Sequence, residues 1–237
     1  KLWNWYQGKT ISKSSTIVAK NLTQLLYQLS NESEALRLES AYALGDLGES
    51  AVPNLFDRLA DDFIGSYAAL ALGASDETAI PALTSALKHS DENVRARAAY
   101  SLGDLGQSTA IPHLLSVLDD SAPRVRRNAA ESLGNISLSE DDDQFSEEQS
   151  SALGNLLQDK YYWVRDNAAR SLAKMGKKAE GAVPFLQSVL NNDENRYVRF
   201  NTIIALKEIG TPLAREIVFD HLLASRWCSL TSEENPF

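Results

Sequence analysis

The residue types that most often perform chemistry are few and widely spaced in this chain. Three histidines, His89, His113 and His221, lie far apart in the sequence, and Cys228 is the single cysteine. His221 and Cys228 stand seven residues apart, but a zinc site needs three or four such ligands at compatible spacing. The sequence contains no HxxxH or CxxC pair and no glycine-rich phosphate loop. We therefore predict no metal site and no catalytic residues in this chain.

The most regular polar feature is a column of five arginines that recur at the same place in similar segments. Two neighbours in this column, Arg95 and Arg126, are 31 residues apart. A guanidinium group offers a rigid fork of donors that suits carboxylate and carbonyl oxygens. We predict that the column holds neighbouring segments in register by binding loop acids and helix-end carbonyls. The column comprises Arg37, Arg95, Arg126, Arg165 and Arg199, and the candidate loop acids, which could also cap the next helix, are Asp91, Asp120, Asp159 and Asp193.

These arginines belong to a sequence repeat that covers most of the chain. The segment VRARAAYSLGDLG begins at position 94, and related segments begin at 36, 125, 164 and 198. In the segment that begins at 94, Val94, Ala98 and Leu102 fall on one stripe of a helix, so they must be buried against neighbouring elements. A degenerate copy, IGSYAALALG at 64, has Gly65 where the others have arginine. One such helix cannot bury its stripe alone, so the six copies predict a stacked repeat array.

A second motif lies between the copies and predicts a partner helix. It reads AVPNLFDRL at 51, AIPALTSAL at 79, AIPHLLSVL at 110 and AVPFLQSVL at 182. Proline is favoured in the first turn of a helix, which places helix starts at Pro53, Pro81, Pro112 and Pro184. Glycine suits the left-handed cap that ends a helix, which places helix ends at Gly48, Gly106, Gly176 and Gly210. We therefore predict an all-α fold, a right-handed α-solenoid of about six antiparallel helix pairs.

The unit SDENVRARAAYSLGDLGQSTAIPHLLSVL resembles the short HEAT-like repeat of the phycobilisome-lyase family, and the resemblance extends over residues 31–224. Proteins with this repeat include bilin lyases, phycobilisome-degradation factors and scaffolds that perform no chemistry of their own. We interpret the chain as a protein–protein interaction scaffold or adaptor without a cofactor. The alternative is a phycobilin lyase or chaperone that holds an open-chain tetrapyrrole bilin for a phycobiliprotein. In that alternative, some arginines of the column would bind the bilin propionates.

In HEAT-like folds the second helix of each pair lines the concave surface. The residues two positions after each column arginine, or after Gly65 in the degenerate copy, are expected to be exposed on this surface. They are Glu39, Tyr67, Arg97, Asn128, Asn167 and Asn201. Five residues after come Tyr42, Leu70, Tyr100, Glu131, Arg170 and Ile204, a mixture that includes typical interface anchors. The alternatives are packing against the adjacent repeat and, for the asparagines, local bonds to the backbone. The predicted partner-binding residues are Arg97, Tyr100, Asn128, Glu131, Asn167, Arg170 and Asn201.

The charge of the chain bears on the kind of partner it can bind. The formal net charge is -9, whereas a nucleic-acid groove requires a basic surface. The acidic stretch SEDDDQFSEEQ begins at 139, in an insertion over 138–149 that lengthens the local repeat to 39 residues. We interpret this insertion as a solvated, mobile loop, with a docking site for a basic partner as the alternative. No nucleic acid is therefore expected among the partners.

The remaining features concern the compartment and the ends of the chain. No run of 18 apolar residues predicts a membrane span. A single cysteine fits a reducing compartment, and the resemblance implies the cyanobacterial cytosol or the plastid stroma. Aromatic residues at both ends, Trp3, Trp5 and Trp227, are expected to cap the stack. The expected division is an N-terminal aromatic segment and capping helix at 1–30, the array at 31–224 and a tail at 225–237. Because the chain begins at Lys1, we expect it to be part of a longer protein.

Overall fold

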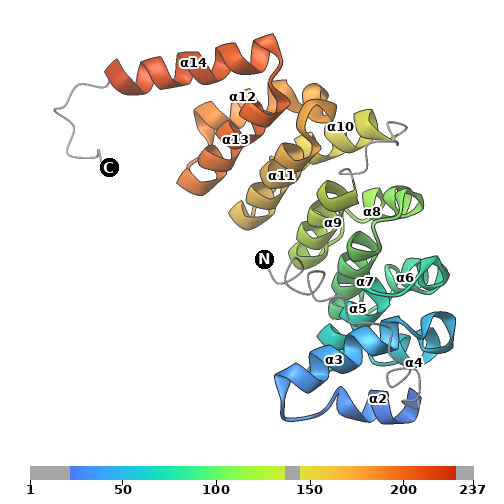
Figure 1. The fold of residues 1–237 in the computed structure, drawn as a ribbon. Coiled ribbons are helices and arrows are strands. Elements are labelled where there is room, and N and C mark those ends of the chain that lie inside the picture. Colours follow the sequence, from blue (N-terminus) through green and yellow to red (C-terminus); the bar gives the residue numbers. More distant parts are fainter. Residues whose placement is uncertain (1–21, 137–144, 228–237) are drawn as a thin grey trace, which may run out of the picture.

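The computed structural model describes residues 22–136 and 145–227, which form helices joined by short turns. The helices follow one another as antiparallel pairs that stack into a curved array (Figure 1). No strand occurs among the described residues. The predicted all-α solenoid is therefore confirmed, and the described ranges contain six helix pairs followed by one further helix, α14 (Pro212–Trp227).

The two helices of each pair lie on opposite sides of the array. The first helices, of which α6, α8 and α10 mark the outer edge in Figure 1, are α2 (Leu22–Gln28), α4 (Val52–Phe56), α6 (Ile80–Ala86), α8 (Ile111–Leu115), α10 (Ser146–Leu156) and α12 (Val183–Asn192). The second helices line the inner, concave side and are α3 (Glu34–Gly45), α5 (Gly65–Gly73), α7 (Glu92–Leu105), α9 (Pro123–Ile136), α11 (Tyr162–Met175) and α13 (Arg196–Ile209). Short 3-10 turns lead into four of the first helices: η1 (Gly48–Ser50), η2 (Glu77–Ala79), η3 (Ser108–Ala110) and η4 (Gly176–Ala182).

Proline marks the helix starts as predicted, and glycine marks three of the four predicted helix ends, whereas Gly48 lies three residues beyond the end of α3. Each of four prolines occupies one of the first two positions of a helix, where its missing N–H costs no hydrogen bond: Pro53, Pro81, Pro112 and Pro184. Four glycines have φ between 55° and 68°: Gly48, Gly106, Gly176 and Gly210. Gly106 and Gly210 end α7 and α13 in the left-handed conformation, which a residue with a side chain rarely adopts.

The apolar stripe of the repeat is buried along the whole array. The leucine seven residues after each column position has no exposed surface, and the set is Leu44, Leu72, Leu102, Leu133, Leu172 and Leu206. These leucines belong to one hydrophobic cluster that runs continuously from α2 to α14. The core is therefore shared between neighbouring pairs, as expected for a solenoid.

Small residues allow successive second helices to approach closely. A Cβ atom on Gly103 of α7 would lie 2.5 Å from the Cβ atom of Ser132 on α9. The Ser132 hydroxyl donates a hydrogen bond of 2.9 Å to the carbonyl of Ala99, across the same junction. Gly134 repeats this contact at the next junction, where a Cβ would lie 2.7 Å from the Cα of Ser171. The glycine eight residues after the arginine is therefore a packing position, which the apolar pattern does not reveal.

The range expected to form the acidic insertion is partly helical. Residues 137–144 lie outside the described part of the chain, but α10 begins at Ser146, inside the expected range 138–149. Its first turn contains Glu147 and Glu148, whose negative charges suit a helix N-terminus. Gln149 is buried. The interpretation as a solvated loop is therefore wrong for residues 146–149, and the role of the preceding acids stays a prediction.

The expected aromatic caps lie outside the described structure. Residues 1–21, which include Trp3 and Trp5, are not described, and neither are Cys228 and the side chain of Trp227. The described part of the segment 1–30 is mainly α2, whose Leu25 and Leu29 are buried in the core. The caps therefore stay a prediction.

Candidate binding groove

Each of the five column arginines binds the loop that precedes its own helix. In every case Nη1 of the arginine donates to the carbonyl of the residue six positions earlier, over 2.6–2.9 Å. Arg126, for example, donates to the carbonyl of Asp120 over 2.7 Å. A buried carbonyl without a partner is costly, so these bonds stabilise the loop between the two helices of a pair. The acceptors are Asn31, His89, Asp120, Asp159 and Asp193.

Three of the column arginines also bind the next repeat. Arg126 forms a bidentate ion pair with Asp159, with Nε–Oδ2 and Nη2–Oδ1 distances of 2.6 and 3.0 Å. Only 10% of the Arg126 side chain and 6% of the Asp159 side chain are exposed. The same bidentate geometry joins Arg95 to Asp120 and Arg165 to Asp193. We call these three pairs the arginine ladder; it connects α7, α9, α11 and the loop before α13.

Two of the ladder carboxylates, Asp120 and Asp193, are held in their charged form. Burial alone would raise the pKa of Asp120 and Asp193, but the hydrogen bonds that they accept outweigh it. These bonds come from Arg95 and Arg165 and from backbone N–H groups, and they hold both pKa values below the ordinary value of an aspartate. Asp91, the fourth candidate loop acid, instead accepts from the backbone N–H of Asn93 and caps α7.

We expect this arrangement to make the protein sensitive to acid. A carboxyl group with a lowered folded-state pKa stabilises the fold above its unfolded pKa, about 3.9, and this contribution is lost as the pH falls through the folded value. The free energy of unfolding, measured by urea denaturation between pH 7 and pH 3, should therefore decrease below about pH 4. Asp193→Asn should flatten this decrease, whereas Asp220→Asn on the exposed side of α14 should not. If Asp193→Asn showed the same decrease in the free energy of unfolding at acidic pH as the wild-type chain, the stabilising role of the charged Asp193 would be contradicted.

The arginine ladder does not extend to α5. Gly65 stands at the arginine position and Leu59, six residues earlier, stands at the aspartate position. Arg97 of the next helix, α7, donates from Nη1 to the carbonyl of Leu59 over 2.5 Å. A Cβ on Gly65 would lie 2.7 Å from Cζ of Arg97. Arg97 therefore occupies the space of the missing arginine and binds the carbonyl that this arginine would bind.

Arg37 is affected by the same interruption, because Leu59 cannot act as its acidic partner. Its guanidinium carbon lies 5.3 Å from the ring centroid of Phe63 and 5.0 Å from that of Tyr67. Both distances are within the range of a cation–π interaction. The junction between α3 and α5 thus uses aromatic contacts where the later junctions use ion pairs.

The column two residues after the arginine is less exposed than expected. Arg97 and Asn128 are each only 8% exposed, so the expectation of exposure is wrong for both. The Asn128 amide donates to the carbonyl of Ala96 over 2.8 Å, and its oxygen accepts from Arg127. Polar side chains in the middle of a helix often find such partners nearby. These two residues therefore form part of the groove wall.

The other two asparagines of this column are half-buried. The Asn167 amide donates to the carbonyl of Trp163, one turn earlier in α11, over 3.0 Å. The Asn201 amide donates to Oδ1 of Asp166 over 2.6 Å and so joins α13 to α11. Each amide thus has a partner within the array, and the partner-binding role of the asparagines stays a prediction.

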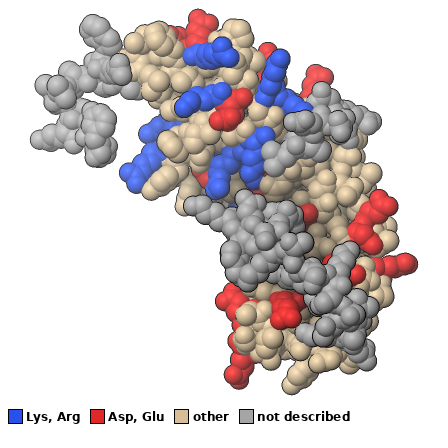
Figure 2. Space-filling model, in the orientation of Figure 1, with Lys and Arg blue, Asp and Glu red and all other residues tan. Residues whose placement is uncertain are grey.

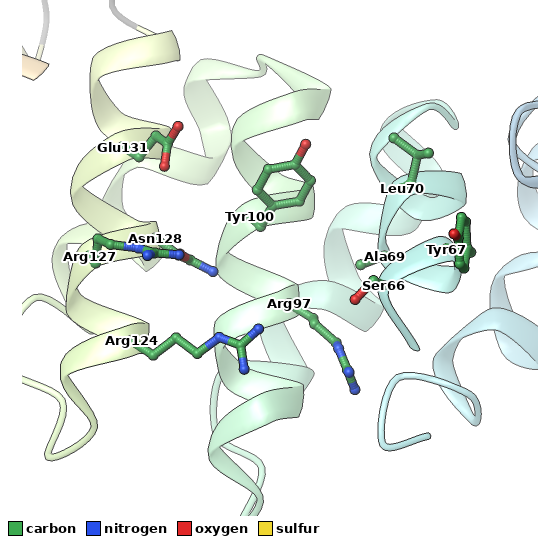
Figure 3. Close-up of a pocket in the computed structure, with 10 residues that line it drawn as sticks. All are labelled: Ser66, Tyr67, Ala69, Leu70, Arg97, Tyr100, Arg124, Arg127, Asn128 and Glu131. Carbon is green, nitrogen blue, oxygen red and sulfur yellow. The ribbon is translucent and has the colours of Figure 1, made fainter. Parts of the chain in front are cut away.

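A cavity of about 420 Å³ opens on the concave side between α5, α7 and α9. Figure 3 shows Arg124 of α9 and Arg97 of α7 on one side of it, and Tyr100 between the two flanking helices. The side of the cavity formed by α5 carries Tyr67 and Leu70. Tyr100 is 38% exposed. The cavity thus combines cationic, aromatic and aliphatic groups on three successive repeats.

The cavity brings together four of the seven predicted partner-binding residues: Arg97, Tyr100, Asn128 and Glu131. Asn167 and Arg170 on α11 and Asn201 on α13 lie outside it. Arg124 and Arg127 also line the cavity, but they were not predicted from the sequence. Arg124 lies two residues before the column arginine Arg126 and Arg127 lies one residue after it, so neither belongs to the two columns that were compared. Comparing every position of the second helix across the repeats, including the positions next to Arg126, could have found them.

Positive charge is concentrated at one end of the cavity. Burial and the nearby Arg124 lower the pKa of Arg97, against smaller opposing effects of Asp62, Asp91 and Asp61. Arg124 donates to the neutral side-chain oxygen of Asn93 over 2.9 Å, and the Arg127 guanidinium lies 5.8 Å from the ring centroid of Trp163. Within the described part of the chain, neither Arg97, Arg124 nor Arg127 has a carboxylate at ion-pair distance.

Neither a metal site nor a membrane span is found in the described residues. Over 22–136 and 145–227, no three His, Cys, Asp or Glu side chains come together as a metal site requires. Within the same ranges no helix has the length and apolar character of a membrane span.

Several solved structures are similar to this chain. A designed armadillo repeat protein in complex with the peptide (KR)4 is 21% identical, with a TM-score of 0.53 over 81% of this chain and 100% of that chain. An engineered protein is 22% identical, with a TM-score of 0.52 over 90% of this chain and 65% of that chain. The CpcE–CpcF complex of the phycocyanin lyase from Nostoc sp. PCC7120 is 20% identical, with a TM-score of 0.48 over 86% and 94% of the two chains.

Sequence comparison identifies the family. No curated protein matches the sequence of this chain. The family model of HEAT repeats matches residues 64–134 and 150–227, which together exceed half of the chain. These ranges contain α5 to α8 and α11 to α14 and parts of α9 and α10, with the arginine ladder and the buried leucines of these helices. The chain therefore belongs to the HEAT-repeat family.

Proposed function

We propose that this chain is a protein-interaction scaffold that binds an extended segment of a partner protein along its concave side. The observation that carries this proposal is the cavity between α5, α7 and α9, where Tyr100 is exposed beside arginines that have no carboxylate at ion-pair distance within the described part of the chain. Tyrosine and arginine are enriched among residues that dominate binding energy at protein interfaces. A designed armadillo repeat protein of similar fold is complexed with a peptide, which supports a groove of this kind as a peptide-binding surface.

The repeat supplies further contact positions beyond the cavity. Arg170 on α11 occupies the same repeat position as Tyr100 and Glu131, and it is exposed. A segment that crosses the second helices would therefore meet one such side chain on each of α7, α9 and α11. Because the amides of Asn128, Asn167 and Asn201 already have partners in the array, we assign the larger share of binding to Tyr100 and Arg170.

The bilin-lyase alternative receives no support from three of the five column arginines. Arg95, Arg126 and Arg165 already hold aspartates in bidentate pairs, so they are not available to bilin propionates. The test is direct: phycocyanobilin is added to the protein and the visible spectrum is recorded. A red shift with pigment that comigrates with the protein would revive this alternative.

The proposed function is tested by selecting peptides from a displayed random library on the purified chain. A representative selected peptide is then labelled, and its affinity is measured by fluorescence polarisation. Tyr100→Ala should weaken binding at least about tenfold, because truncating an interface hot spot costs more than about 1.4 kcal/mol. Tyr27→Ala on α2 is the matched control, since Tyr27 is 78% exposed and lies outside the groove. Equal affinities for both variants, or no selected peptides at all, would refute the proposal.

A further inference from the structure

We propose that the partner segment is acidic and that its carboxylate side chain binds in the cavity against Arg97, Arg124 and Arg127. This inference rests on the proposed function and specifies the chemistry of the segment that the groove binds. It goes beyond that function because nothing in the repeat fold requires a particular charge in the ligand.

The first observation is a contrast between two sets of arginines in the same array. The ladder arginines Arg95, Arg126 and Arg165 each hold a carboxylate in a bidentate pair. The three cavity arginines hold only neutral oxygens, such as the carbonyl of Leu59 and the side chain of Asn93. A guanidinium group forms its strongest hydrogen bonds with carboxylates. The cavity therefore presents donors that an acidic ligand would satisfy better than any described residue does.

The second observation is the burial of Arg97. Its residue is 8% exposed, and its buried Nε has no hydrogen-bond partner within the described part of the chain. A buried charge with an unsatisfied donor is unfavourable unless an opposite charge approaches it. Arg97 lines the cavity, so a carboxylate that enters the cavity would offset this cost.

The third observation is that the two outer arginines are already oriented. Both Nε and Nη2 of Arg127 donate to the side-chain oxygen of Asn128, at 3.3 and 3.2 Å. Arg127 also lies over the ring of Trp163, and Arg124 is held by Asn93. Side chains that are fixed before binding lose less conformational entropy when a ligand arrives.

The charges around the cavity favour a carboxylate at one end only. Glu131 also lines the cavity. It lies four residues beyond Arg127 in α9 and seven residues beyond Arg124, which is about 10 Å along the helix axis. Figure 3 shows Glu131 turned away from Arg97 and Arg124. Leu70 and Tyr100 lie nearer that other end. The segment that fits is therefore one with an acidic residue followed or preceded by an apolar one.

The wider surface agrees with this assignment. The chain carries a net charge of -9, yet Lys and Arg side chains gather over α11 and α13 on the face shown in Figure 2. Arg170 and Lys174 on α11 continue the positive charge beyond the cavity. An acidic segment would be attracted to this part of the groove and repelled by most of the remaining surface.

The test uses the displayed random library and compares the peptides selected by three proteins. The wild-type chain should select a pool enriched in Asp and Glu over the input library. Arg124→Gln/Arg127→Gln should lose this enrichment, and a wild-type-selected peptide should bind it about 10- to 100-fold more weakly, since each charge-assisted bond contributes strongly. The control Lys88→Gln/Lys177→Gln removes the same charge from exposed positions outside the groove, and it should keep both the enrichment and the affinity.

The outcomes separate this inference from the proposed function. A pool without acidic enrichment, whose peptides still require Tyr100, would overturn the acidic assignment and leave the scaffold function intact. Equal losses in the groove variant and in the control would show that only net charge matters, which also overturns it. A labelled dT20 oligonucleotide is the last arm. Tighter binding of dT20 than of the selected peptides, lost in Arg124→Gln/Arg127→Gln, would assign these cations to nucleic acid and refute the inference.

Discussion

Arg126→Ala should lower the free energy of unfolding by about 3–5 kcal/mol, because it leaves a buried aspartate without its counter-charge. Asp159 has only 6% of its side chain exposed and accepts two hydrogen bonds from Arg126. The substitution also removes the donor to the carbonyl of Asp120. Urea denaturation followed by circular dichroism measures the loss. Because Arg126 joins α9 to the loop before α11, the loss reports on the central junction of the array.

Two further variants interpret this result. Arg126→Lys keeps the charge but cannot form the bidentate fork, so it should recover only part of the stability. Arg196→Ala removes an arginine from an exposed position in the first turn of α13, and it should change stability by no more than about 0.5 kcal/mol. If Arg126→Ala left the stability unchanged and abolished peptide binding instead, the arginine column would bind the partner and would not hold neighbouring repeats in register.

The fold could be predicted because its signals are local and repeated. Pro112 and Gly106, for example, mark a helix start and a helix end by backbone chemistry that acts within a few residues. Leu102 and its equivalents share one helical stripe, so their burial follows from periodicity alone. Six repetitions of the same signals leave little ambiguity about the architecture.

The groove could be predicted only in part, because its details depend on contacts between repeats. The sequence places Arg97 at an off-stripe position, which suggests exposure, but the missing side chain at Gly65 opens a buried space that Arg97 fills. Asn128 is likewise buried through a bond to the preceding helix. Conversely, Arg127 acquires its orientation from Trp163, 36 residues later in the chain. No pattern within a single repeat contains this information.

The degenerate repeat leads to the second large prediction, in which two substitutions restore the pattern of the other repeats. Gly65→Arg alone should cost about 1–3 kcal/mol, because the new side chain would overlap Arg97. Arg97→Asn alone should cost a comparable amount, about 1.5–3 kcal/mol, because the buried carbonyl of Leu59 loses a charged donor. In the double variant, the new arginine can donate to Leu59, and asparagine is the residue found at the position of Arg97 in the repeats of α9, α11 and α13.

The double variant should therefore lose less stability than the sum of the two single losses, by about 1–3 kcal/mol, which a double-mutant cycle measures directly. Gly73→Ala supplies the control: it lies on the same helix, α5, but its Cβ would approach Asp104 instead of Arg97. Its cost should add to that of Arg97→Asn within about 0.5 kcal/mol. Additive losses for Gly65→Arg and Arg97→Asn would mean that Arg97 does not replace the missing arginine. Coupled losses would mean that the missing side chain at Gly65 leaves the space in which Arg97 of the next repeat is buried as part of the groove wall.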